Sequence, residues 1–413
     1  MRIFKFGGSS VKDALGVQNT LKVLLHEGVQ NTLVVVSAMG KMTNAFENLV
    51  NAYAKSEGSI SNSIQYIVNY HENIAKELFE ENNVIFKDID SVFNELGVFL
   101  ETNKNSNYNF IYDQIVCFGE LLSTKIMSAY LTNNGVQNVW LDIRTIIKTD
   151  QKYRKANVNW GQTLQNCQKH IDKNQLYITQ GFIGSDTLNN ESTTLGREGS
   201  DFTAGILAYC LDAESVTIWK DVVGVLNADP RVFKNTVLLN EISYQEAIEM
   251  AFYGASVIHP KTLKPLENKR IPLWVRSFEH LDNEGTKVSK GNTLVPKTPC
   301  YIVKTNQILV SISANDFSFM VEENMSDLFN FFHQYNLKVN LIQNSALSFS
   351  VCLEDVFGNF DAFYKELQPK FKIKYNSNVT LFTIRHFDEN AINSIEQKGT
   401  VLLKQLSRET AQM

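Results

Sequence analysis

Blocks of one charge and long apolar runs are missing from this 413-residue sequence, whose formal net charge of −5 is spread along the chain. Without a clustered basic face, the sequence does not favour a nucleic-acid-binding protein. No apolar run approaches the ~20 residues that a membrane helix requires. Because the apolar stretch of MRIFKFGG stops at Gly7, we also expect no signal peptide. We therefore expect neither nucleic acid nor membrane as a partner.

Cysteine is also scarce. The thiols are scattered and none forms the CxxC pair typical of a metal site; the five are Cys117, Cys167, Cys210, Cys300 and Cys352. Because they give no disulfide framework, we predict reduced thiols, a cytoplasmic protein and no metal held by the protein itself. With 44% hydrophobic and 20% charged residues, the composition is that of a globular protein long enough for two or three domains.

Short β-rich runs alternate with longer helical patterns over the first 280 or so residues, which predicts a parallel sheet of α/β type. The run around TLVVVS is continuously apolar, as expected for a strand buried on both faces. We expect strands at Ile3–Phe6, Asn31–Ser37, Val139–Asp142, Leu176–Ile183, Ser215–Lys220 and Pro272–Ser277. A polar helical excursion fills residues 45–116, and it is compatible with either a lid or an oligomer contact.

Proline is absent from the first 229 residues, and two of the seven prolines fall in KGNTLVPKTPC. This stretch predicts a boundary between a first domain at 1–290 and a second at 300–413. In the second domain, strands and apolar-faced helices are expected in the order βαββαβ, at 308–313, 328–335, 339–342, 347–353, 360–367 and 379–385. That order is the ferredoxin-like pattern.

The first expected strand carries a lysine ahead of two glycines and two serines, in Ile3-Phe-Lys-Phe-Gly-Gly-Ser-Ser-Val11. A P-loop carries its lysine after the glycines, so this order excludes that motif. Backbone N–H groups, hydroxyls and one positive charge are nevertheless the components of a phosphate site. The fragment alone leaves a second interpretation open, an ordinary strand-to-helix turn with an incidental lysine.

Two further stretches place polar groups where a substrate could bind. In Val35-Val-Ser-Ala-Met-Gly-Lys-Met-Thr43, small and polar residues follow a strand that we expect to be buried. They would lie at the carboxyl ends of the strands, where open α/β sheets bind ligands. In Cys117-Phe-Gly-Glu-Leu121 we expect Glu120 to open a helix, where it would complement the helix dipole or receive a substrate ammonium group. Each stretch alone is also compatible with an ordinary turn or cap.

A glycine-rich stretch, Leu195-Gly-Arg-Glu-Gly-Ser-Asp-Phe202, precedes a helix expected from about Phe202 to Leu211. Helix capping would account for Ser200 or Asp201, but it leaves Arg197 and the glycines unexplained. Arg197 can grip a carboxylate with its bidentate fork, and the helix N-terminus adds N–H donors for an anion. This stretch therefore favours a functional site.

A last stretch with candidate functional residues is Ile218-Trp-Lys-Asp-Val-Val-Gly-Val-Leu-Asn-Ala-Asp-Pro-Arg231. Here we expect Lys220, Asp221 and Arg231 to reach the ligand-binding edge of the predicted parallel sheet. Together the motifs KFGGSSV, VVSAMG, GE, GREGSD, WKDVVGVLNADPR and EISYQEAIEM resemble, in this order, the aspartate kinases (aspartokinases) of the amino-acid kinase fold. The resemblance runs from residue 1 to about 385, and YGASVIHP and the pair Gly285-Thr286 agree with it.

The resemblance implies an amino-acid kinase fold followed by an ACT-type, ferredoxin-like domain. It also implies transfer of the γ-phosphoryl group of MgATP to the side-chain carboxylate of L-aspartate, giving 4-phospho-L-aspartate and ADP, the first step toward lysine, threonine and methionine. Lys5 and Lys220 would neutralise phosphate charge, and Asp201 would orient these lysines. The residues implied for aspartate are Thr43, Glu120, Arg197 and Ser200. Those implied for the nucleotide are Lys5, Gly7, Gly8, Ser9, Lys220, Asp221, Leu226, Arg231 and Ser256.

The chain departs from the family pattern at three of these motifs. Ser9 replaces the threonine of KFGGTS, Glu198 replaces the second glycine of GRGGSD, and Ser256 stands where many members carry a lysine near the nucleotide. Two other functions stay open, a glutamate-type amino-acid kinase and a catalytically inert amino-acid-sensing regulator. The intact lysine, arginine and aspartate of the motifs argue against the inert regulator.

Room for only one complete ACT module follows residue 308, where aspartate kinases commonly have two. The remaining 388–413 offers a helix-like stretch at 390–398 and at most one final strand. The family's VDLI strand reads Val339-Asn-Leu-Ile342, so Asn340 replaces an aspartate that helps hold the amino group of an effector. We therefore predict weak or absent feedback inhibition by lysine or threonine, and a C-terminal region that mainly forms a homodimer or a higher homo-oligomer. A partner chain that supplies the other half of the ACT pair stays an alternative.

Overall fold

The computed structural model describes residues 1–255, 258–316 and 318–413. The chain forms two compact units. The first comprises Met1–Val225, Leu238–Ile248 and the described residues of 257–296, and the second comprises Leu226–Val237 with the described residues of 249–256 and 297–413. Two short segments that precede residue 297 in the sequence therefore belong to the second unit.

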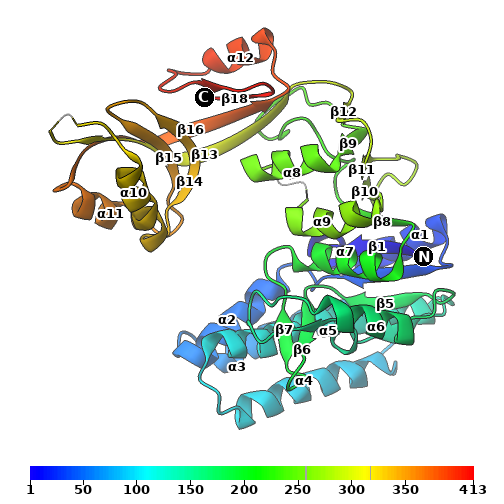
Figure 1. Ribbon diagram of the computed structural model, residues 1–413. Coiled ribbons are helices and arrows are strands. Elements are labelled where there is room, and N and C mark those ends of the chain that lie inside the picture. The colour runs from blue at the N-terminus through cyan, green and yellow to red at the C-terminus, as the bar shows by residue number, and fades with distance from the viewer. Residues whose placement is uncertain (256–257, 317) are drawn as a thin grey trace. The chain divides into compact units, whose positions relative to one another are not determined.

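A nine-stranded sheet with the order β12-β9-β11-β10-β8-β1-β2-β5-β3 forms the centre of the first unit (Figure 1). β1 pairs in parallel with both β2 and β8, whereas β10–β11 and β9–β12 are antiparallel. The predicted α/β class is confirmed. The strands are β1 Arg2–Phe6, β2 Thr32–Val36, β3 Val139–Leu141, β5 Tyr177–Gln180, β8 Ser215–Lys220, β9 Glu241–Ser243, β10 Leu273–Ser277, β11 Thr286–Ser289 and β12 Leu294–Val295.

The central strands are apolar because they are covered on both faces. Every residue of β2, TLVVV, is buried, as its continuous apolar run predicts. α7 packs against β1, β2 and β8, and α5 packs against β2, β3 and β5. The helices of this unit are α1 Ala14–Glu27, α2 Met42–Lys55, α3 Ile60–Leu78, α4 Ile85–Thr102, α5 Tyr108–Asn133, α6 Trp160–His170, α7 Gly199–Leu211 and α9 Pro260–Lys269; α8 Tyr244–Tyr253 has residues in both units.

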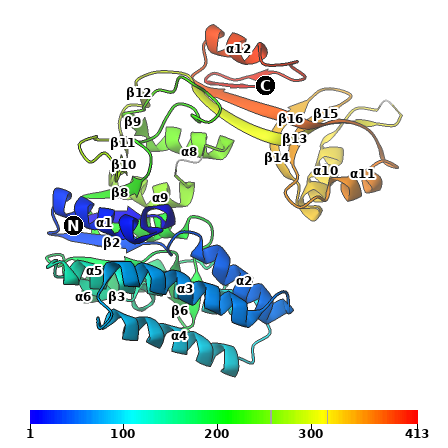
Figure 2. The same ribbon diagram turned by 180° about the vertical axis from the view of Figure 1, so that it is seen from behind.

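The helical excursion is a packed part of this unit. α2 packs against α3 and α5, and α4 packs against α3 and α5, so the four helices form one group on the strands (Figure 1). α4 lies outermost in both views (Figure 2). Among the described helices, none combines the length and the apolarity that crossing a bilayer would demand.

Two predictions for this unit were wrong. The strand expected at 176–183 breaks after Gln180, and β6 Ile183–Asp186 joins a separate small sheet with β4 Lys148–Thr149 and β7 Ser192–Thr194. The break falls at Phe182, whose φ of 69° lies in the left-handed region and ends the extended backbone. Beside it, Gly181 leaves room for Ser200, since a Cβ at Gly181 would lie 2.5 Å from the Cβ of Ser200. Glu120 was expected to open a helix, but it lies in the middle of α5, because the apolar pattern continues unbroken from Phe110.

In the second unit, the chain follows the βαββαβ order with a sheet ordered β14-β15-β13-β16-β18-β17. The first four strands, with α10 and α11, form the predicted ferredoxin-like module. The elements are β13 Cys300–Ala314, α10 Glu322–Gln334, β14 Lys338–Asn344, β15 Phe349–Glu354, α11 Phe360–Leu367, β16 Phe371–Arg385, α12 Glu389–Glu396, β17 Gln405–Leu406 and β18 Thr410–Gln412.

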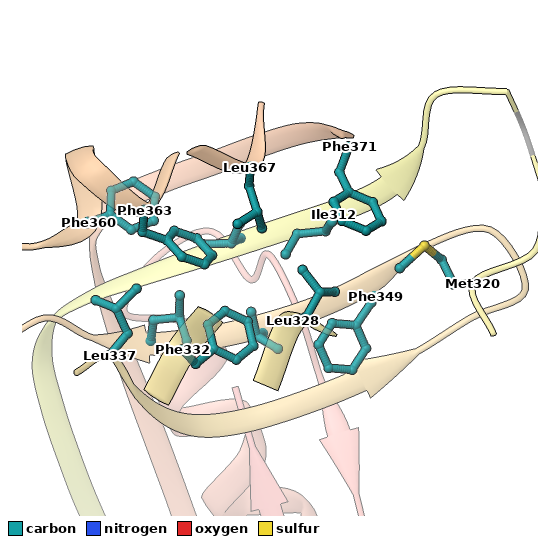
Figure 3. Packing of buried hydrophobic residues seen from close by; sticks show 13 residues of the cluster. Ile312, Met320, Leu328, Phe332, Leu337, Phe349, Phe360, Phe363, Leu367 and Phe371 are labelled. Atoms are coloured by element: carbon teal, nitrogen blue, oxygen red, sulfur yellow. The ribbon is translucent and has the colours of Figure 1, made fainter. Parts of the chain in front are cut away.

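An aromatic-rich core holds the two helices of this module on its sheet. The rings of Phe332 on α10 and Phe363 on α11 lie 5.4 Å apart between the helices (Figure 3). Leu328 and Leu367 are fully buried beside them, and Phe349 reaches the same cluster from β15. The apolar spacing along both helices therefore faces the sheet, as the sequence predicts.

Candidate active site

The site is built where β1 ends. Lys5 lies in a strand flanked by β2 and β8, and its Nζ is 2.6 Å from Oδ1 of Asp201, in the first turn of α7. The two side chains are only 10% and 7% exposed. Because an unpaired charge at this depth costs several kcal/mol, each group needs the other. The ion pair therefore fixes the lysine ammonium at the carboxyl end of the central strands.

Two glycines let the chain turn directly after β1. A Cβ at Gly7 would lie 3.3 Å from Nζ of Lys5, and a Cβ at Gly8 would lie 2.8 Å from the carbonyl oxygens of Ala38 and Gly40. Gly40 also donates its N–H to the carbonyl of Gly8 at 2.9 Å. The turn after β1 thus packs tightly on the loop after β2, with backbone N–H groups beside the buried lysine.

The N-terminus of α7 forms the other wall. The N-cap is Glu198, and its side chain makes no capping hydrogen bond. The capping interpretation of Ser200 and Asp201 was therefore wrong, because both lie inside the first turn. Gly199 packs against Phe182, where a Cβ would lie 2.6 Å from Cδ2 of that ring. The uncapped first turn provides N–H donors of the kind that bind anions.

A cavity of about 440 Å³ opens between these walls. It is lined by residues of β1, β7, α2, α5 and α7, and of the segments that follow β2 and β5 and precede α6 and α7. They are Lys5, Ser37, Thr43, Tyr112, Glu120, Arg154, Lys155, Phe182, Thr194, Gly196, Arg197, Glu198, Gly199, Ser200 and Asp201.

Glu120 gives the cavity a buried acidic group. The residue is 2% exposed, and desolvation raises the pKa of its carboxyl to about 8, although backbone hydrogen bonds act in the opposite direction. Its Oε2 has no hydrogen-bond partner within the part of the chain that the structure describes. A buried carboxylate oxygen without a partner is a strong acceptor for a ligand ammonium group.

Comparisons with known proteins bear on this geometry. The amino acid kinase family matches residues 1–277. Lysine-sensitive aspartokinase 3 of Escherichia coli is 31% identical over 357 residues, which are 85% of this chain and 78% of that protein. The chain belongs to the amino acid kinase family and, within it, to the aspartokinases. The resemblance carried by the motifs is confirmed.

Other relatives differ from the chain in length. A bifunctional aspartokinase/homoserine dehydrogenase of Arabidopsis thaliana is 28% identical over 385 residues, which are 89% of this chain but 42% of that protein. A crystal structure of E. coli aspartokinase III in complex with aspartate and ADP superposes with a TM-score of 0.79 at 26% identity, covering 100% of this chain and 95% of that one.

Six of the residues that the aspartokinase motifs imply meet in the cavity: Lys5, Thr43, Glu120, Arg197, Ser200 and Asp201. Lys220 ends β8, beside the strand that carries Lys5. Ser9 is exposed, and its neighbour Ser10 instead donates its hydroxyl to the carbonyl of Trp219, which ties the turn to β8. Asp221 is exposed after β8.

Two of the implied nucleotide residues are absent from the cavity lining, and a third falls outside the described residues. Leu226 and Arg231 belong to the second unit. Arg231 is largely exposed there, and its guanidinium pairs with Asp229 at 2.7 Å. Ser256 lies outside the described residues. For these three residues the assignment to the nucleotide rests on the motif alone.

Several lining residues were missed by sequence reasoning, among them Tyr112, Arg154, Lys155, Phe182 and Thr194. They reach the cavity through contacts between distant segments, so no local motif identifies them. A signal existed only for Arg154 and Lys155, two adjacent cations in the polar loop QKYRKAN.

Glu198 occupies a backbone conformation that suits glycine, with a φ of 54°. We expect Glu198→Gly to raise the unfolding free energy by about 0.5–1 kcal/mol, the left-handed penalty less the extra freedom of glycine. We also expect a roughly twofold lower KM for aspartate, because an exposed negative charge leaves the cavity lining. Glu198→Gln is the matched control in denaturation and kinetic assays. It should reproduce the KM change without the stability gain, and equal stability of both variants would contradict the argument.

Proposed function

We propose that the chain is an ATP-dependent aspartate kinase that phosphorylates the side-chain carboxylate of L-aspartate. The observation that carries this proposal is the cavity itself, which combines the buried, unpartnered carboxyl oxygen of Glu120 with the cations Lys5 and Arg197 and the uncapped α7 N-terminus. An acceptor for one ammonium group faces donors for two carboxylates. The E. coli relative with bound aspartate and ADP supports the same assignment.

The chemistry needs positioning more than proton transfer. A carboxylate nucleophile is already ionised at neutral pH, since its ordinary pKa is about 4. Lys5, held by Asp201 at 2.6 Å, would neutralise charge on the transferring phosphoryl group together with Lys220. Mg²⁺ enters with ATP as part of the substrate. The N–H groups of the Gly7–Gly8 turn and of α7 would then hold phosphate and carboxylate oxygens.

In this assignment each aspartate group has its own partner. Glu120 takes the ammonium group, Arg197 takes the α-carboxylate with help from Ser200, and Thr43 at the start of α2 holds the reacting carboxylate. The pKa of Glu120 fits this role, because an incoming ammonium group stabilises the ionised form that burial disfavours.

A coupled assay of ADP release tests the proposal. Purified chain should release ADP with L-aspartate and MgATP, and much more slowly with L-glutamate or N-acetyl-L-glutamate at equal concentration. Preference for either glutamate compound would identify another amino-acid kinase. No amino-acid-dependent release at all would favour an inert regulator.

Dimerisation through the second unit and a cytoplasmic location remain proposals. All five cysteines are buried and none of them is in a disulfide, which supports a reducing compartment. The antiparallel sheet of the second unit ends in β14, and an edge strand of this kind can pair with another chain.

Feedback inhibition is expected to be weak, because the side chain of Asn340 is already engaged. Its Oδ1 accepts from Nζ of Lys304 at 2.8 Å, and its Nδ2 donates to Oε1 of the buried Gln307 at 2.7 Å. An ammonium group of the chain itself thus fills the acceptor that an effector would need. In a titration with lysine or threonine we expect no half-inhibition below millimolar concentration, with E. coli aspartokinase 3 as the sensitive control. Sub-millimolar half-inhibition would contradict this interpretation of Asn340.

A further inference from the structure

Arg154, in the loop between β4 and α6, has a backbone conformation that arginine rarely adopts. Its φ is +67°, in the left-handed region where glycine is the usual residue. The conformation is held from outside the loop: the backbone N–H of Arg154 donates to both carboxylate oxygens of Asp113, at 3.0 and 3.2 Å. Asp113 is fully buried on α5, and desolvation raises its pKa to about 6.

The same carboxylate connects Arg154 to the cavity wall. Asp113 also accepts the backbone N–H and the hydroxyl of Thr194, both at 2.8 Å, and Thr194 lines the cavity. The loop between β7 and α7 packs directly on Arg154, since a Cβ at Gly196 would lie 3.2 Å from the carbonyl oxygen of Arg154. The main chain at Arg154 is therefore fixed against the loop that carries Arg197.

The side chain is oriented by aromatic rings. Its guanidinium carbon lies 4.3 Å from the ring centroid of Tyr112 and 5.8 Å from that of Tyr108. Tyr112 is itself held by a 2.6 Å hydrogen bond from its hydroxyl to Glu47. Within the described residues, no hydrogen bond or ion pair engages the guanidinium N–H groups of Arg154. A planar cation with unused donors is thus held beside the cavity.

The cavity is lined by charged groups of both signs. Tyr112 and Glu120 are eight residues apart on α5, or about 12 Å along the helix axis. Arg154 lies on the ring of Tyr112, and Glu120 and Arg197 line the same cavity. An amino acid whose ammonium group is bound at Glu120 would direct its carboxylates toward the arginines.

We propose that Arg154 is a further substrate-binding residue, which binds a carboxylate of the amino-acid substrate together with Arg197. This inference rests on the proposed kinase function. An arginine held in a left-handed conformation by a buried carboxylate and two rings is explained when its side chain is needed for binding. A planar fork beside a carboxylate also provides paired, charge-assisted hydrogen bonds.

Arg154→Gly tests the inference without threatening the fold, because glycine adopts a φ of +67° freely. We expect an unchanged or higher Tm, a KM for aspartate raised roughly 10- to 100-fold, and kcat and the KM for ATP within about twofold of the wild type. Arg154→Lys keeps the charge but not the planar guanidinium. Its KM for aspartate should lie between those of the wild type and Arg154→Gly.

Arg270→Gly is the matched control. Arg270 is an exposed arginine with a φ of +57°, and it ends α9 away from the cavity lining. Its replacement should change Tm in the same direction and leave the KM for aspartate unaltered. If Arg154→Gly fails to fold, Arg154→Met, which keeps the stem on Tyr112 without the charge, allows the same comparison.

The outcomes separate this inference from the proposed function. If the wild type phosphorylates aspartate and both Arg154→Gly and Arg154→Met keep its KM for aspartate within about twofold, the inference is overturned and the kinase assignment stands. If the wild type does not phosphorylate aspartate, both fail. A KM change of equal size for ATP and aspartate would mark a structural effect and also overturn it.

Discussion

Lys5→Met is expected to lower kcat by about 10²- to 10³-fold, the usual loss when one preorganised charge or donor is removed from a transition state. Methionine keeps the length of the side chain in the buried strand but removes the ammonium group that lies 2.6 Å from Asp201. The KM for aspartate should change much less than kcat, because the missing charge acts on the transferring phosphoryl group. Steady-state kinetics with both substrates varied gives the comparison.

The variant also leaves Asp201 as an unpaired carboxylate that is only 7% exposed. We therefore expect a loss of stability of about 3–5 kcal/mol, unless the carboxyl takes up a proton. The double variant Lys5→Met/Asp201→Asn is the matched control, because it removes the buried charge as well. It should recover most of the stability and none of the activity. Activity of Lys5→Met within a few-fold of the wild type would remove Lys5 from the mechanism.

Glu120→Gln is expected to raise the KM for aspartate by about 10²-fold, the range measured for one partner of a buried, hydrogen-bonded charge pair. The amide keeps the shape of the side chain and cannot attract an ammonium group by charge. The KM for ATP should stay close to that of the wild type. If instead ATP binding weakens and the KM for aspartate does not change, Glu120 does not hold the amino group.

The raised pKa of Glu120 adds a pH dependence to the same site. With a pKa of about 8 the carboxyl is mostly protonated at neutral pH, whereas aspartate requires the ionised form. The KM for aspartate should therefore fall as pH rises through about 8, with release of a proton on binding, and Glu120→Gln should lack this trend. Isothermal titration calorimetry in two buffers of different ionisation enthalpy measures that proton.

Stability of the ligand-free chain should follow the opposite direction. Burial raises the pKa of Glu120 in the folded state from 4.5 to about 8, so the folded state binds the proton more tightly than the unfolded state. Its contribution to stability is fully present below the unfolded pKa and is lost as pH rises toward and through 8. Relative to Glu120→Gln, the wild type should lose Tm over that range, and saturating aspartate should reduce the loss.

Much of the fold could be predicted because local patterns were strong. TLVVV could only be a strand covered on both faces, and the apolar spacing of Phe360–Leu367 matched α11 at both ends. The break after Gln180 could not be predicted, because nothing local marks Phe182 as a left-handed residue, and Ser200, which packs on Gly181, comes from the distant α7. The prediction that Glu120 opens a helix was wrong because the sequence alone does not show where a long buried helix such as α5 begins.

The candidate site divides in the same way. Lys5, Arg197 and Asp201 stand in short motifs whose residue types indicate their chemistry. Arg154 is placed by Asp113, 41 residues away, and Thr194 is placed by the same carboxylate across 81 residues. Contacts of that range leave no periodicity or spacing in the sequence, so they are found only once the chain is folded.

The central claim is that the γ-phosphoryl group passes to the side-chain carboxylate of L-aspartate. Trapping the product with hydroxylamine measures this directly, because an acyl phosphate reacts to give a hydroxamate at the carboxyl group that was phosphorylated. With MgATP and L-aspartate we expect β-aspartyl hydroxamate in amounts equal to the ADP released, and none above background with Lys5→Met. ADP release without hydroxamate, or a hydroxamate at the α-carboxyl, would contradict the account.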